Sequence, residues 1–305
     1  MGEQDRRKPL RIALVTARAA RGLDEDEPPL RMALQAAGCE ADATEWDDRT
    51  IDWASFDVVL LRSAWDYAER LAEFLEWVER TAAVTRVLNP PPVIRWNTDK
   101  HYLARLAEKG IATVPSRFVE PGQSAAQALA EVLDRHANAE LVIKPAVGAG
   151  ARDAQRHRRT QKTAAVAHIE RLLAQGRSVL VQPFLERVND EGETALMFFE
   201  GHFSHAIRKG LLLAASGAPT AGLFAPETIS SRTPGADERK LAEQVIAGLP
   251  FETLLYARID LIRGDQGEPR LLELELTEPS LYFTYAAGSA EQFAAALLRR
   301  HPPAA

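Results

Sequence analysis

Residues 254–276, LLYARIDLIRGDQGEPRLLELEL, decide the fold prediction for this chain. Within them, the runs 254–262 and 271–276 alternate side chains in the two-residue period of a β-strand. The Gly-Asp-Gln-Gly sequence at 264–267 suits a tight turn, so the two runs are predicted to form a hairpin. In the second run the acidic side chains share one face of the predicted sheet, and the opposite face carries Leu272, Leu274 and Leu276.

This hairpin is predicted to carry a metal site. Folding one strand onto the other brings Asp260 opposite Glu273 and Glu275. Three converging carboxylates need a cation, and oxygen ligands without histidine or cysteine suit Mg²⁺, which usually also takes phosphate oxygens. These residues therefore indicate an enzyme that uses ATP. The alternative interpretation is a solvated sheet face that happens to be acidic.

The composition bounds the size of the protein and its partners. A chain of 305 residues with 46% hydrophobic residues has room for two or three domains. The net charge of −6 argues against a nucleic-acid or anionic-membrane partner, although local basic residues can still bind small anionic substrates. Cys39 is the one cysteine in the sequence, which excludes a disulfide framework and a cysteine-based metal site.

The start of the chain and its hydropathy indicate location. Residues 1–8 are charged and lack the apolar core of a signal peptide. No apolar run approaches the ~18 residues that a membrane-spanning helix needs. We therefore expect a cytoplasmic protein.

The first 95 residues predict a parallel α/β layer. Strands at 10–16 and 57–62 alternate with helices, one opened by Pro28 and Pro29 and another at 68–84. Strands that alternate with helices in this way form a parallel sheet covered by helices. Residues 1–95 are therefore predicted to be an N-terminal α/β domain.

Two further domains of the α+β class are predicted to follow. Asn89 to Pro92 is predicted to be a stiff connection, and Asn97-Thr98 to cap the next helix. Residues 96–185 contain short strands and two helices, and form a smaller central domain. Residues 186–305 contain strand-like runs, the acidic hairpin and a C-terminal helix.

Two segments of the predicted central domain suit a nucleotide. Lys144 ends a β-branched strand, and the loop Gly148-Ala149-Gly150-Ala151 follows, so an ammonium and free N–H groups can meet phosphates. The strand 179–185 runs into Pro183, after which free main-chain groups can bind an adenine edge. The alternatives are a flexible surface turn with a solvated lysine for the first segment and a core strand for the second.

Two further segments suit a substrate. Arg208 and Lys209 end a strand-like run and are suited to hold a phosphate or carboxylate, with an exposed basic turn as the alternative. The run Arg62-Ser63-Ala64-Trp65-Asp66-Tyr67 follows a buried strand, and ligands bind outside the carboxyl ends of strands in open α/β sheets. A carboxylate or polar tail is expected at Arg62 and an ammonium group at Asp66.

In their order along the chain, these pieces resemble the ATP-grasp superfamily of ligases. The matched pieces span roughly residues 100–280: Lys100, Lys144 with its Gly-Ala loop, Val181-Gln182-Pro183-Phe184, Glu193, Ala206-Ile207-Arg208-Lys209, Arg258-x-Asp260 and Glu273-x-Glu275. The resemblance implies an ATP-grasp fold, in which an N-terminal α/β domain helps to hold the substrate and two α+β domains grip ATP. The family pattern E-x-N followed by Pro-Gly is altered here, so either Glu275 or Thr277 takes the place of the third metal ligand.

The resemblance also implies roles for individual residues. Nucleotide contacts are assigned to Lys100, Lys144, Gly148, Gly150, Gln182, Phe184, Leu185 and Glu193. Mg²⁺, with Mn²⁺ as an alternative, is assigned to Asp260, Glu273 and Glu275. Catalysis is assigned to Arg208, which stabilises the transferring phosphoryl group, and to Lys144. Substrate contacts are assigned to Arg62, Ser63, Asp66 and Arg208.

Within the superfamily, the chain is most similar to the O-ureido-serine cyclo-ligase family of cycloserine biosynthesis. The similarity lies in residues 13–18, 24–30, 46–48, 61–67, 89–91 and 95–100. It implies a C–N bond formed through an acyl phosphate, by ring closure of a small amino-acid-like substrate. An intermolecular amino-acid or peptide ligase and a nucleotide-binding regulatory protein without turnover are the alternatives, and self-association stays open.

Overall fold

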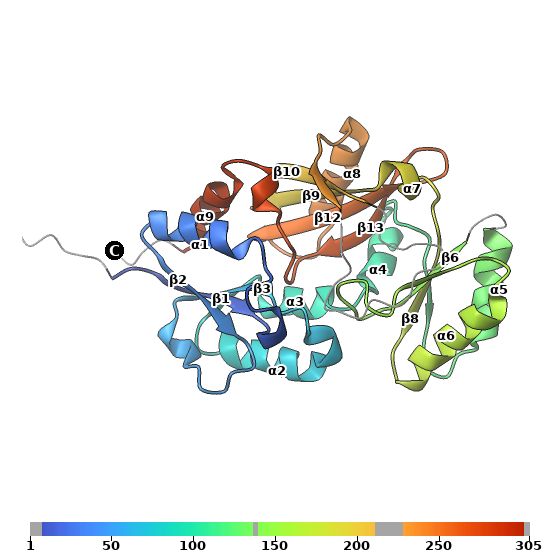
Figure 1. Cartoon of the computed structure of the whole chain (residues 1–305), viewed down its shortest axis with the longest axis horizontal. Coiled ribbons are helices and arrows are strands. Elements are labelled where there is room, and N and C mark those ends of the chain that lie inside the picture. The colour runs from blue at the N-terminus through green and yellow to red at the C-terminus, as the bar shows by residue number, and fades with distance from the viewer. Residues whose placement is uncertain (1–7, 137–139, 211–227, 302–305) are drawn as a thin grey trace, which may run out of the picture.

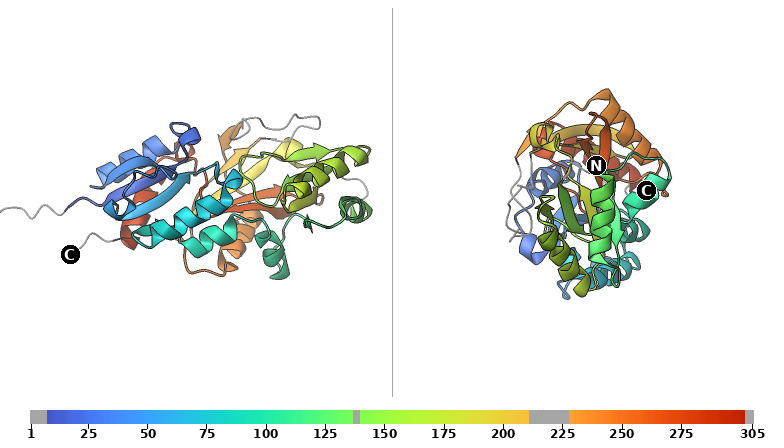
Figure 2. Two further views of the ribbon diagram at one scale, coloured as in Figure 1. Left: turned by 90° about the horizontal axis from the view of Figure 1, so that it is seen from below. Right: turned by 90° about the vertical axis from the view of Figure 1, so that its right-hand side faces the viewer.

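The computed structural model describes residues 8–136, 140–210 and 228–301, which form three sheets. Figure 1 and Figure 2 show an N-terminal layer in blue, a central layer in green and a C-terminal sheet in yellow to red. No helix in these described ranges has the length and hydropathy needed to cross a membrane. The charged start of the chain, residues 1–7, lies outside the described residues.

The N-terminal layer is the predicted parallel sheet, with strand order β2-β1-β3-β4. Its strands are β1 (Arg11–Thr16), β2 (Glu40–Glu45), β3 (Val58–Ser63) and β4 (Arg86–Leu88). Its helices are α1 (Glu27–Ala36), α2 (Leu71–Ala82) and α3 (Pro91–Asn97). Alternate residues of β1 face opposite ways: Ile12 and Leu14 join the cluster around α1, whereas Ala13 and Val15 join the cluster around α2 and α3. Both faces of β1 are buried, which explains its continuous apolar run.

The connection predicted at Asn89 to Pro92 is a helix start instead. Pro91 and Pro92 occupy the first positions of α3, where proline is tolerated because the missing N–H is not needed there. Asn97 does not cap the following helix α4 (Tyr102–Glu108), which is preceded by His101. Its side chain instead donates to the carbonyl of Leu274 at 2.8 Å and accepts the N–H of Leu276 at 2.7 Å. Asn97, a residue type that favours helix N-caps, is thus used for tertiary hydrogen bonds to β13 and the residue after it.

The C-terminal sheet has the order β11-β10-β9-β12-β13. Its strands are β9 (Glu193–Phe199), β10 (His202–Lys209), β11 (Ile229–Ser231), β12 (Tyr256–Arg263) and β13 (Pro269–Glu275). Its helices are α7 (Val188–Glu191), α8 (Ala236–Ala247) and α9 (Ser289–Arg300). The predicted hairpin is present: β12 and β13 pair antiparallel, with Asp260 opposite Glu273 and Arg258 opposite Glu275.

A β-bulge corrects one detail of the hairpin. Asp260 pairs with Glu273, but the next residue, Leu261, pairs with Leu271, so Leu272 is the extra residue. Leu271 therefore joins Leu274 and Leu276 in the core under the sheet. Leu272 was predicted to share that face, and instead packs in a separate apolar cluster.

The central sheet has the order β5-β8-β6-β7. Its strands are β5 (Arg117–Val119), β6 (Leu141–Pro145), β7 (Gln155–His157) and β8 (Val179–Pro183). Helices α5 (Ala125–Arg135) and α6 (Lys162–Ala174) cover one face through Leu141, Ile143, Val179 and Val181. The intervening residues of β6 and β8, which include Lys144 and Gln182, turn to the opposite face.

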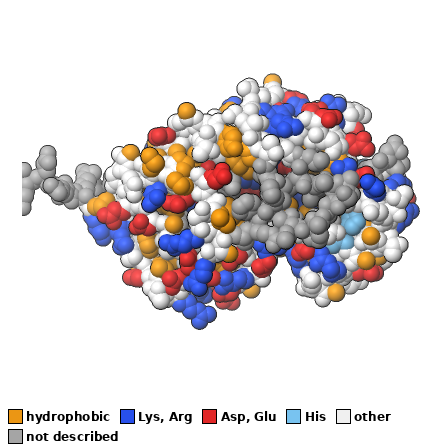
Figure 3. Space-filling model, viewed as in Figure 1, with side chains coloured by type: hydrophobic (Ala, Val, Ile, Leu, Met, Phe, Trp, Pro, Cys, Tyr) orange, Lys and Arg blue, Asp and Glu red, His pale blue; other side chains and the backbone are white. Residues whose placement is uncertain are grey.

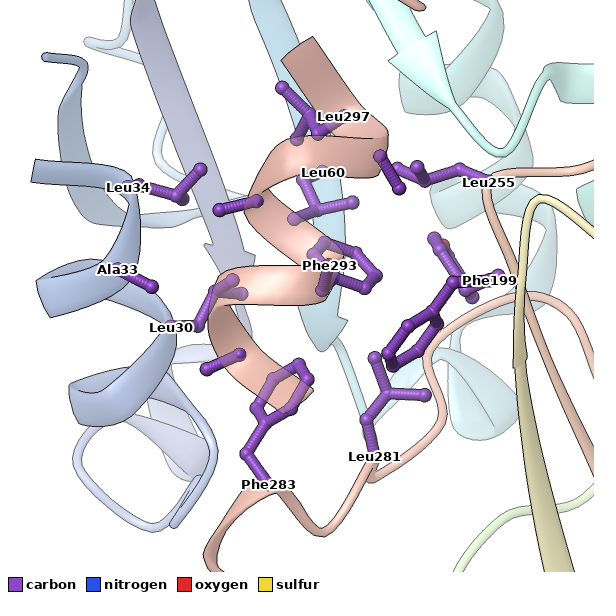
Figure 4. Close-up of a cluster of buried hydrophobic side chains, with 14 of the residues drawn as sticks. Leu30, Ala33, Leu34, Leu60, Phe199, Leu255, Leu281, Phe283, Phe293 and Leu297 are labelled. Atoms are coloured by element: carbon purple, nitrogen blue, oxygen red, sulfur yellow. The ribbon is translucent and has the colours of Figure 1, made fainter. Parts of the chain in front are cut away.

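Packing is continuous between the first and last parts of the chain. Figure 4 shows helix α9 between α1 and the C-terminal sheet, with Leu30 and Leu34 of α1 on one side and Phe293 turned towards Phe199 on the other; all four belong to one core cluster. The same cluster contains Leu60 of β3. Residues 1–95 and 186–305, predicted as separate domains, therefore share one core. On the face shown in Figure 3, acidic and basic side chains are interspersed over the N-terminal layer.

A buried histidine pair lies beneath α6. His157 Nε2 and His168 Nδ1 are 3.2 Å apart, and burial, together with the charge of His157, lowers the pKa of His168 to about 4. Both rings are therefore neutral in the folded protein at pH 7. An unfolded histidine titrates near pH 6.5, so the unfolded chain takes up the proton first as the pH falls.

We expect this pair to weaken the protein in mild acid. Stability contributed by neutral His168 is complete above about pH 6.5 and is lost as the pH falls towards 4, by roughly 3 kcal/mol over the whole interval. The measurement is the free energy of unfolding by urea at pH 7 and pH 4.5 for the wild type and His168→Leu. The loss between these pH values should be smaller by roughly 2–3 kcal/mol in the variant. Equal losses in the two proteins would contradict the prediction.

Candidate active site

A cavity of about 410 Å³ lies where the three sheets meet. Its walls include Trp65 and Tyr67 after β3, Lys144 and Gln182 of the central sheet, and Glu273 of β13. Cavities of this size that combine apolar walls with a few placed charges are typical small-molecule sites. The residues that line the cavity fall into three groups: an apolar group, a charged group, and a group of acidic and aromatic side chains.

One part of the cavity is apolar. It is lined by Val114, Val142, Phe184, Leu185, Val188, Ile262 and Leu272. The bulge at Leu272 thus supplies one wall of this part. Arg156 covers the outer face of Phe184, with its guanidinium carbon 3.4 Å from the ring centroid.

Some polar groups at the edge of this apolar part already form hydrogen bonds within the protein. Gln182 Nε2 donates to Ser116 Oγ at 2.8 Å, and the Phe184 N–H donates to the Glu140 carbonyl at 2.7 Å. Among the described residues, none accepts a hydrogen bond from the N–H of Leu185. That N–H is the main-chain group beyond Pro183 that is left to bind a ligand.

Two lysines line the middle of the cavity. Lys100 Nζ donates to the Gly148 carbonyl at 2.7 Å and lies 2.9 Å from Glu273 Oε1. Burial lowers the pKa of Lys144, and the positive charge of Lys100 adds to this, while Glu273 opposes it. The structure thus places both predicted lysines around Glu273, and their phosphate contacts stay a prediction.

The small-residue loop after β6 forms part of the same wall. Gly148 and Gly150 line the cavity, and Gly150 has a φ of 62°, a conformation that favours glycine. At Gly148 an added Cβ would lie 3.1 Å from the Pro145 Cγ, so a larger residue would crowd the turn. Arg152 of this loop pairs with Glu69 beside the N-terminal layer, which joins the loop to the first domain.

Asp260 is buried between two cations. Its Oδ2 accepts from Lys209 Nζ at 2.7 Å, and both its oxygens accept from Arg258 at 2.9 and 3.0 Å. Burial alone would raise the pKa of Asp260, but Arg258 and Lys209 outweigh it and lower the pKa to about 2. Asp260 is therefore a carboxylate at every working pH.

The other acids of the hairpin differ from Asp260. Burial would raise the pKa of Glu273, but Lys100 and Lys144 outweigh it and lower the pKa. Burial and the nearby charges of Asp260 and Glu273 raise the pKa of Glu275 to about 7, although Arg258 contacts its carboxylate. Glu273, next to Lys100, is thus charged, whereas Glu275 is half protonated at neutral pH.

The predicted three-carboxylate metal site is not formed as expected. Among the described residues, no group of three or more His, Cys, Asp or Glu side chains is arranged to hold a metal ion. The reason is that Arg258 forms ion pairs with both Asp260 and Glu275. Its guanidinium therefore occupies the position between the carboxylates where a metal ion was expected. Asp260 and Glu273, opposite each other on adjacent strands, still present the oxygen-only donors that suit Mg²⁺.

Arg208 is not among the residues that line the cavity, and its predicted role in catalysis stays a prediction. Arg208 donates to the carbonyls of Glu191 and Asp190, each at 2.8 Å, at the end of α7. Lys209, the next residue of β10, lines the cavity and lies 3.0 Å from Glu193 Oε2, which also lines it. Because successive strand residues point to opposite faces, only one of the two basic residues can face the cavity.

The predicted substrate residues of the N-terminal layer do not line the cavity. Arg62 is only 1% exposed and pairs with Asp26 at 3.4 Å and Asp24 at 3.7 Å. Ser63 Oγ donates to Thr16 Oγ1 at 2.8 Å, and Asp66 accepts from Trp46 Nε1 at 2.9 Å. All six residues of β3 are buried, and Arg62 and Ser63 contact protein groups, although Arg62 Nε and Nη1 have no hydrogen-bond partner among the described residues.

Sequence reasoning missed the residues that form this end of the cavity. They are Asp24, Glu25, Asp26, Glu278, Ser280, Tyr282 and Tyr285, which join Trp65 and Tyr67 of the predicted run 62–67. Asp26 joins the two segments involved, because its carboxylate accepts the N–H groups of Leu281, Tyr282 and Phe283 at 2.5, 3.0 and 2.8 Å. The acidic loop at 24–27 was a visible signal, but nothing local connects it with residues 278–285.

Comparisons with known proteins agree with this architecture. The family model for the N-terminal domain of D-cycloserine synthetase DcsG matches residues 12–89. The cycloserine biosynthesis protein DcsG of Streptomyces lavendulae is 41% identical over 96% of this chain and 99% of its own length.

Solved structures give the same result in three dimensions. The crystal structure of D-cycloserine synthetase DcsG has a TM-score of 0.87 and 40% identity, and covers 95% of this chain and 99% of its own. The ATP-grasp ligase PsnB has a TM-score of 0.65 at 19% identity, with 95% of this chain and 98% of its own covered. The D-alanine–D-alanine ligase of Bacillus anthracis has a TM-score of 0.63 at 15% identity, with 95% and 96% covered.

Proposed function

Because the chain belongs to the DcsG family and is an ATP-grasp ligase, we propose that it uses ATP and Mg²⁺ to form a C–N bond in an amino-acid derivative. The observation that carries the proposal is the cavity at the meeting of the three sheets. Its apolar part suits an adenine ring, its lysines and carboxylates suit phosphates, and its acidic and aromatic part suits an amino acid. A ligase of this kind needs these three surfaces next to one another.

The nucleotide occupies the apolar part and the middle of the cavity. The adenine ring lies against Phe184 and Leu272, where the Leu185 N–H donates to its edge. The triphosphate extends to Lys144, Lys100 and the loop at Gly148 and Gly150. These positively charged and N–H groups neutralise the charge that phosphoryl transfer redistributes.

Asp260 and Glu273 are the residues that would hold Mg²⁺ between the two strands. When bound there, the ion screens the phosphate oxygens from the acids of the hairpin. Lys209 and Arg258, which neutralise Asp260 at 2.7 and 2.9 Å, keep this carboxylate ionised and oriented. Arg258 also contacts both Asp260 and Glu275, and its guanidinium exchanges Glu275 for the substrate carboxylate when the substrate binds.

The reaction then has two steps. The substrate carboxylate attacks the γ-phosphate, which gives an acyl phosphate and ADP. A nitrogen of the same molecule attacks the acyl carbon, forms the C–N bond and expels phosphate. A cycloserine-type product follows from the relatives' names, and an O-ureido-serine-like substrate follows from the family resemblance of the sequence. Ring closure of that substrate leaves a carbamoyl group on the ring nitrogen, so a cycloserine product also requires hydrolytic loss of this group as ammonia and carbon dioxide. Ring closure has the advantage that the nucleophile is already tethered near the acyl group.

A measurement of ADP release tests this function. With O-ureido-D-serine and ATP alone, we expect ADP and phosphate in equal amounts together with the cyclised product. A requirement for an added amine would indicate an intermolecular ligase. Tight ATP binding without ADP release, with or without an amine, would indicate a nucleotide-binding regulatory protein.

Replacement of Lys144 tests the phosphate subsite. Lys144→Met should raise the KM for ATP about 10- to 100-fold, the effect of one lost charge-assisted contact, while the KM for the amino-acid substrate changes little. Its melting temperature should not fall, because burial already disfavours the charged lysine. Lys162→Met, an exposed lysine at the start of α6, is the matched control. An unchanged KM for ATP in Lys144→Met would remove this lysine from the phosphate site.

A further inference from the structure

Glu278 is a buried carboxyl group in the cavity wall that has no partner among the described residues. It is 7% exposed and lines the cavity, and no described residue forms a hydrogen bond or ion pair with it. The other buried acids of the cavity have cations: Asp260 has Lys209 and Arg258, and Asp24 and Asp26 share Arg62. A buried carboxylate without a counter-charge is costly, so an unmatched one facing a cavity points to a cationic ligand.

The backbone that carries Glu278 is held on both sides. The Thr277 carbonyl accepts from Tyr256 Oη at 2.8 Å, and the Thr277 hydroxyl contacts Asn97 Oδ1 at 3.2 Å. The Ser280 carbonyl accepts from Arg258 at 3.1 Å. The main chain on both sides of Glu278 is therefore fixed, which keeps its Cα at the cavity wall.

The surroundings of Glu278 favour a positively charged group over any other ligand. Trp65, Tyr67, Tyr282 and Tyr285 line the same cavity, and aromatic faces attract cations. The basic residues nearest to this part are already paired, Arg62 with Asp26 and Arg258 with Asp260 and Glu275. Within the described part of the chain, the surroundings of Glu278 thus supply aromatic rings, while the nearest basic residues are engaged elsewhere.

We propose that Glu278 binds the α-ammonium group of the amino-acid substrate, an inference that rests on the proposed function. Arg258, placed to bind the substrate carboxylate, contacts Ser280, which is two residues from Glu278. Groups held by Arg258 and Glu278 therefore lie close together, as the carboxylate and ammonium of an α-amino acid do. The substrate class is an α-amino acid whose amino group is free.

A thermodynamic cycle tests this assignment, in which the amino group of the ligand and the side chain of residue 278 are each changed. The probes are O-ureido-D-serine and 3-(ureidooxy)propanoic acid, which is the same molecule without its amino group. Calorimetric titration gives the dissociation constant of each probe for the wild type and for Glu278→Gln, so that the result does not depend on turnover. Removal of the amino group should weaken binding about 10- to 100-fold in the wild type and less than about 3-fold in the variant.

Two further variants separate binding from folding. Glu278→Gln should keep or raise the melting temperature, because it removes an unpaired buried carboxyl without a change of shape. Glu278→Asp, which keeps the carboxyl group, should restore part of the preference for the amino group. Glu27→Gln, on α1 and paired with Arg31, is the control and should bind both probes as the wild type does.

The outcomes discriminate between this inference and the proposed function. Equal weakening by loss of the amino group in the wild type and Glu278→Gln would overturn the inference, even if ADP is released. A fall in kcat without this difference in binding would also overturn it and would indicate proton transfer by Glu278. A preference for the amino group that depends on Glu278, in a protein that releases no ADP, would support the inference and reject the ligase function. Failure of the wild type to bind O-ureido-D-serine would overturn the assignment.

Discussion

Asp260→Asn is expected to lower kcat about 1,000-fold, the scale seen when a group that stabilises a charged transition state is lost. The carboxylate of Asp260 lies opposite Glu273 on the neighbouring strand and is proposed to hold Mg²⁺ with it. An amide in its place carries no charge for the ion and leaves Lys209 and Arg258 without their shared counter-charge. The measurement is ADP release at saturating ATP over a series of Mg²⁺ concentrations.

This variant should also be less stable. Lys209 keeps Glu193 and Arg258 keeps Glu275, but both lose the buried carboxylate that they share, so the free energy of unfolding should fall by about 3 kcal/mol. Turnover is therefore compared at a temperature where circular dichroism shows the variant folded. Asp237→Asn, which removes a half-exposed acid paired with Arg263, is the matched control and should keep its turnover. Full activity of Asp260→Asn at low Mg²⁺ would contradict the metal assignment.

Arg62→Ala is expected to destabilise the protein by about 3–5 kcal/mol, because it leaves two buried carboxylates without their cation. Arg62 is 1% exposed and lies between Asp24 and Asp26. Asp26 in turn accepts three N–H groups from residues 281–283, so the change loosens both segments that line the substrate end of the cavity. The measurement is unfolding by urea at pH 7.

A comparison variant shows whether the effect belongs to the buried site. Arg21→Ala removes an exposed arginine from the same part of the chain and should change stability by less than about 0.5 kcal/mol. If Arg62 held the substrate, as expected from the sequence, Arg62→Ala would instead raise the KM for the substrate and leave that for ATP nearly unchanged. A stable Arg62→Ala protein with a raised KM for the amino acid alone would restore that interpretation.

The acidic hairpin was predictable because its information is local. Alternation within 254–262 and 271–276 and the turn between them determine which residues pair, and Asp260 lies opposite Glu273 as expected. The bulge at Leu272 was not predictable, because a bulge adds one residue to one strand of a pair and does not require a particular residue type. It transfers one leucine from the core to the wall of the apolar part of the cavity.

The substrate end of the site was not predictable for a different reason. Its parts come from the loop 23–26, the segment 65–67 and the segment 278–285, which meet only in the folded protein. Arg62 seemed a ligand group by its position after a strand, but the acids that bind it belong to another loop. Arg208 and Lys209 are adjacent at the end of β10 and point to opposite faces, and the run alone does not say which of them faces the cavity.

The packing of α9 against α1 has a consequence for synthesis of the protein. One face of the first sheet, with Ile12, Leu14 and Leu60, is covered by α1 together with the last helix of the chain. While the ribosome is still making the middle of the protein, that apolar face has no cover from α9 and is open to other chains. Nascent chains halted before residue 289 should therefore bind chaperones and aggregate. Supply of α9 as a separate peptide should rescue them.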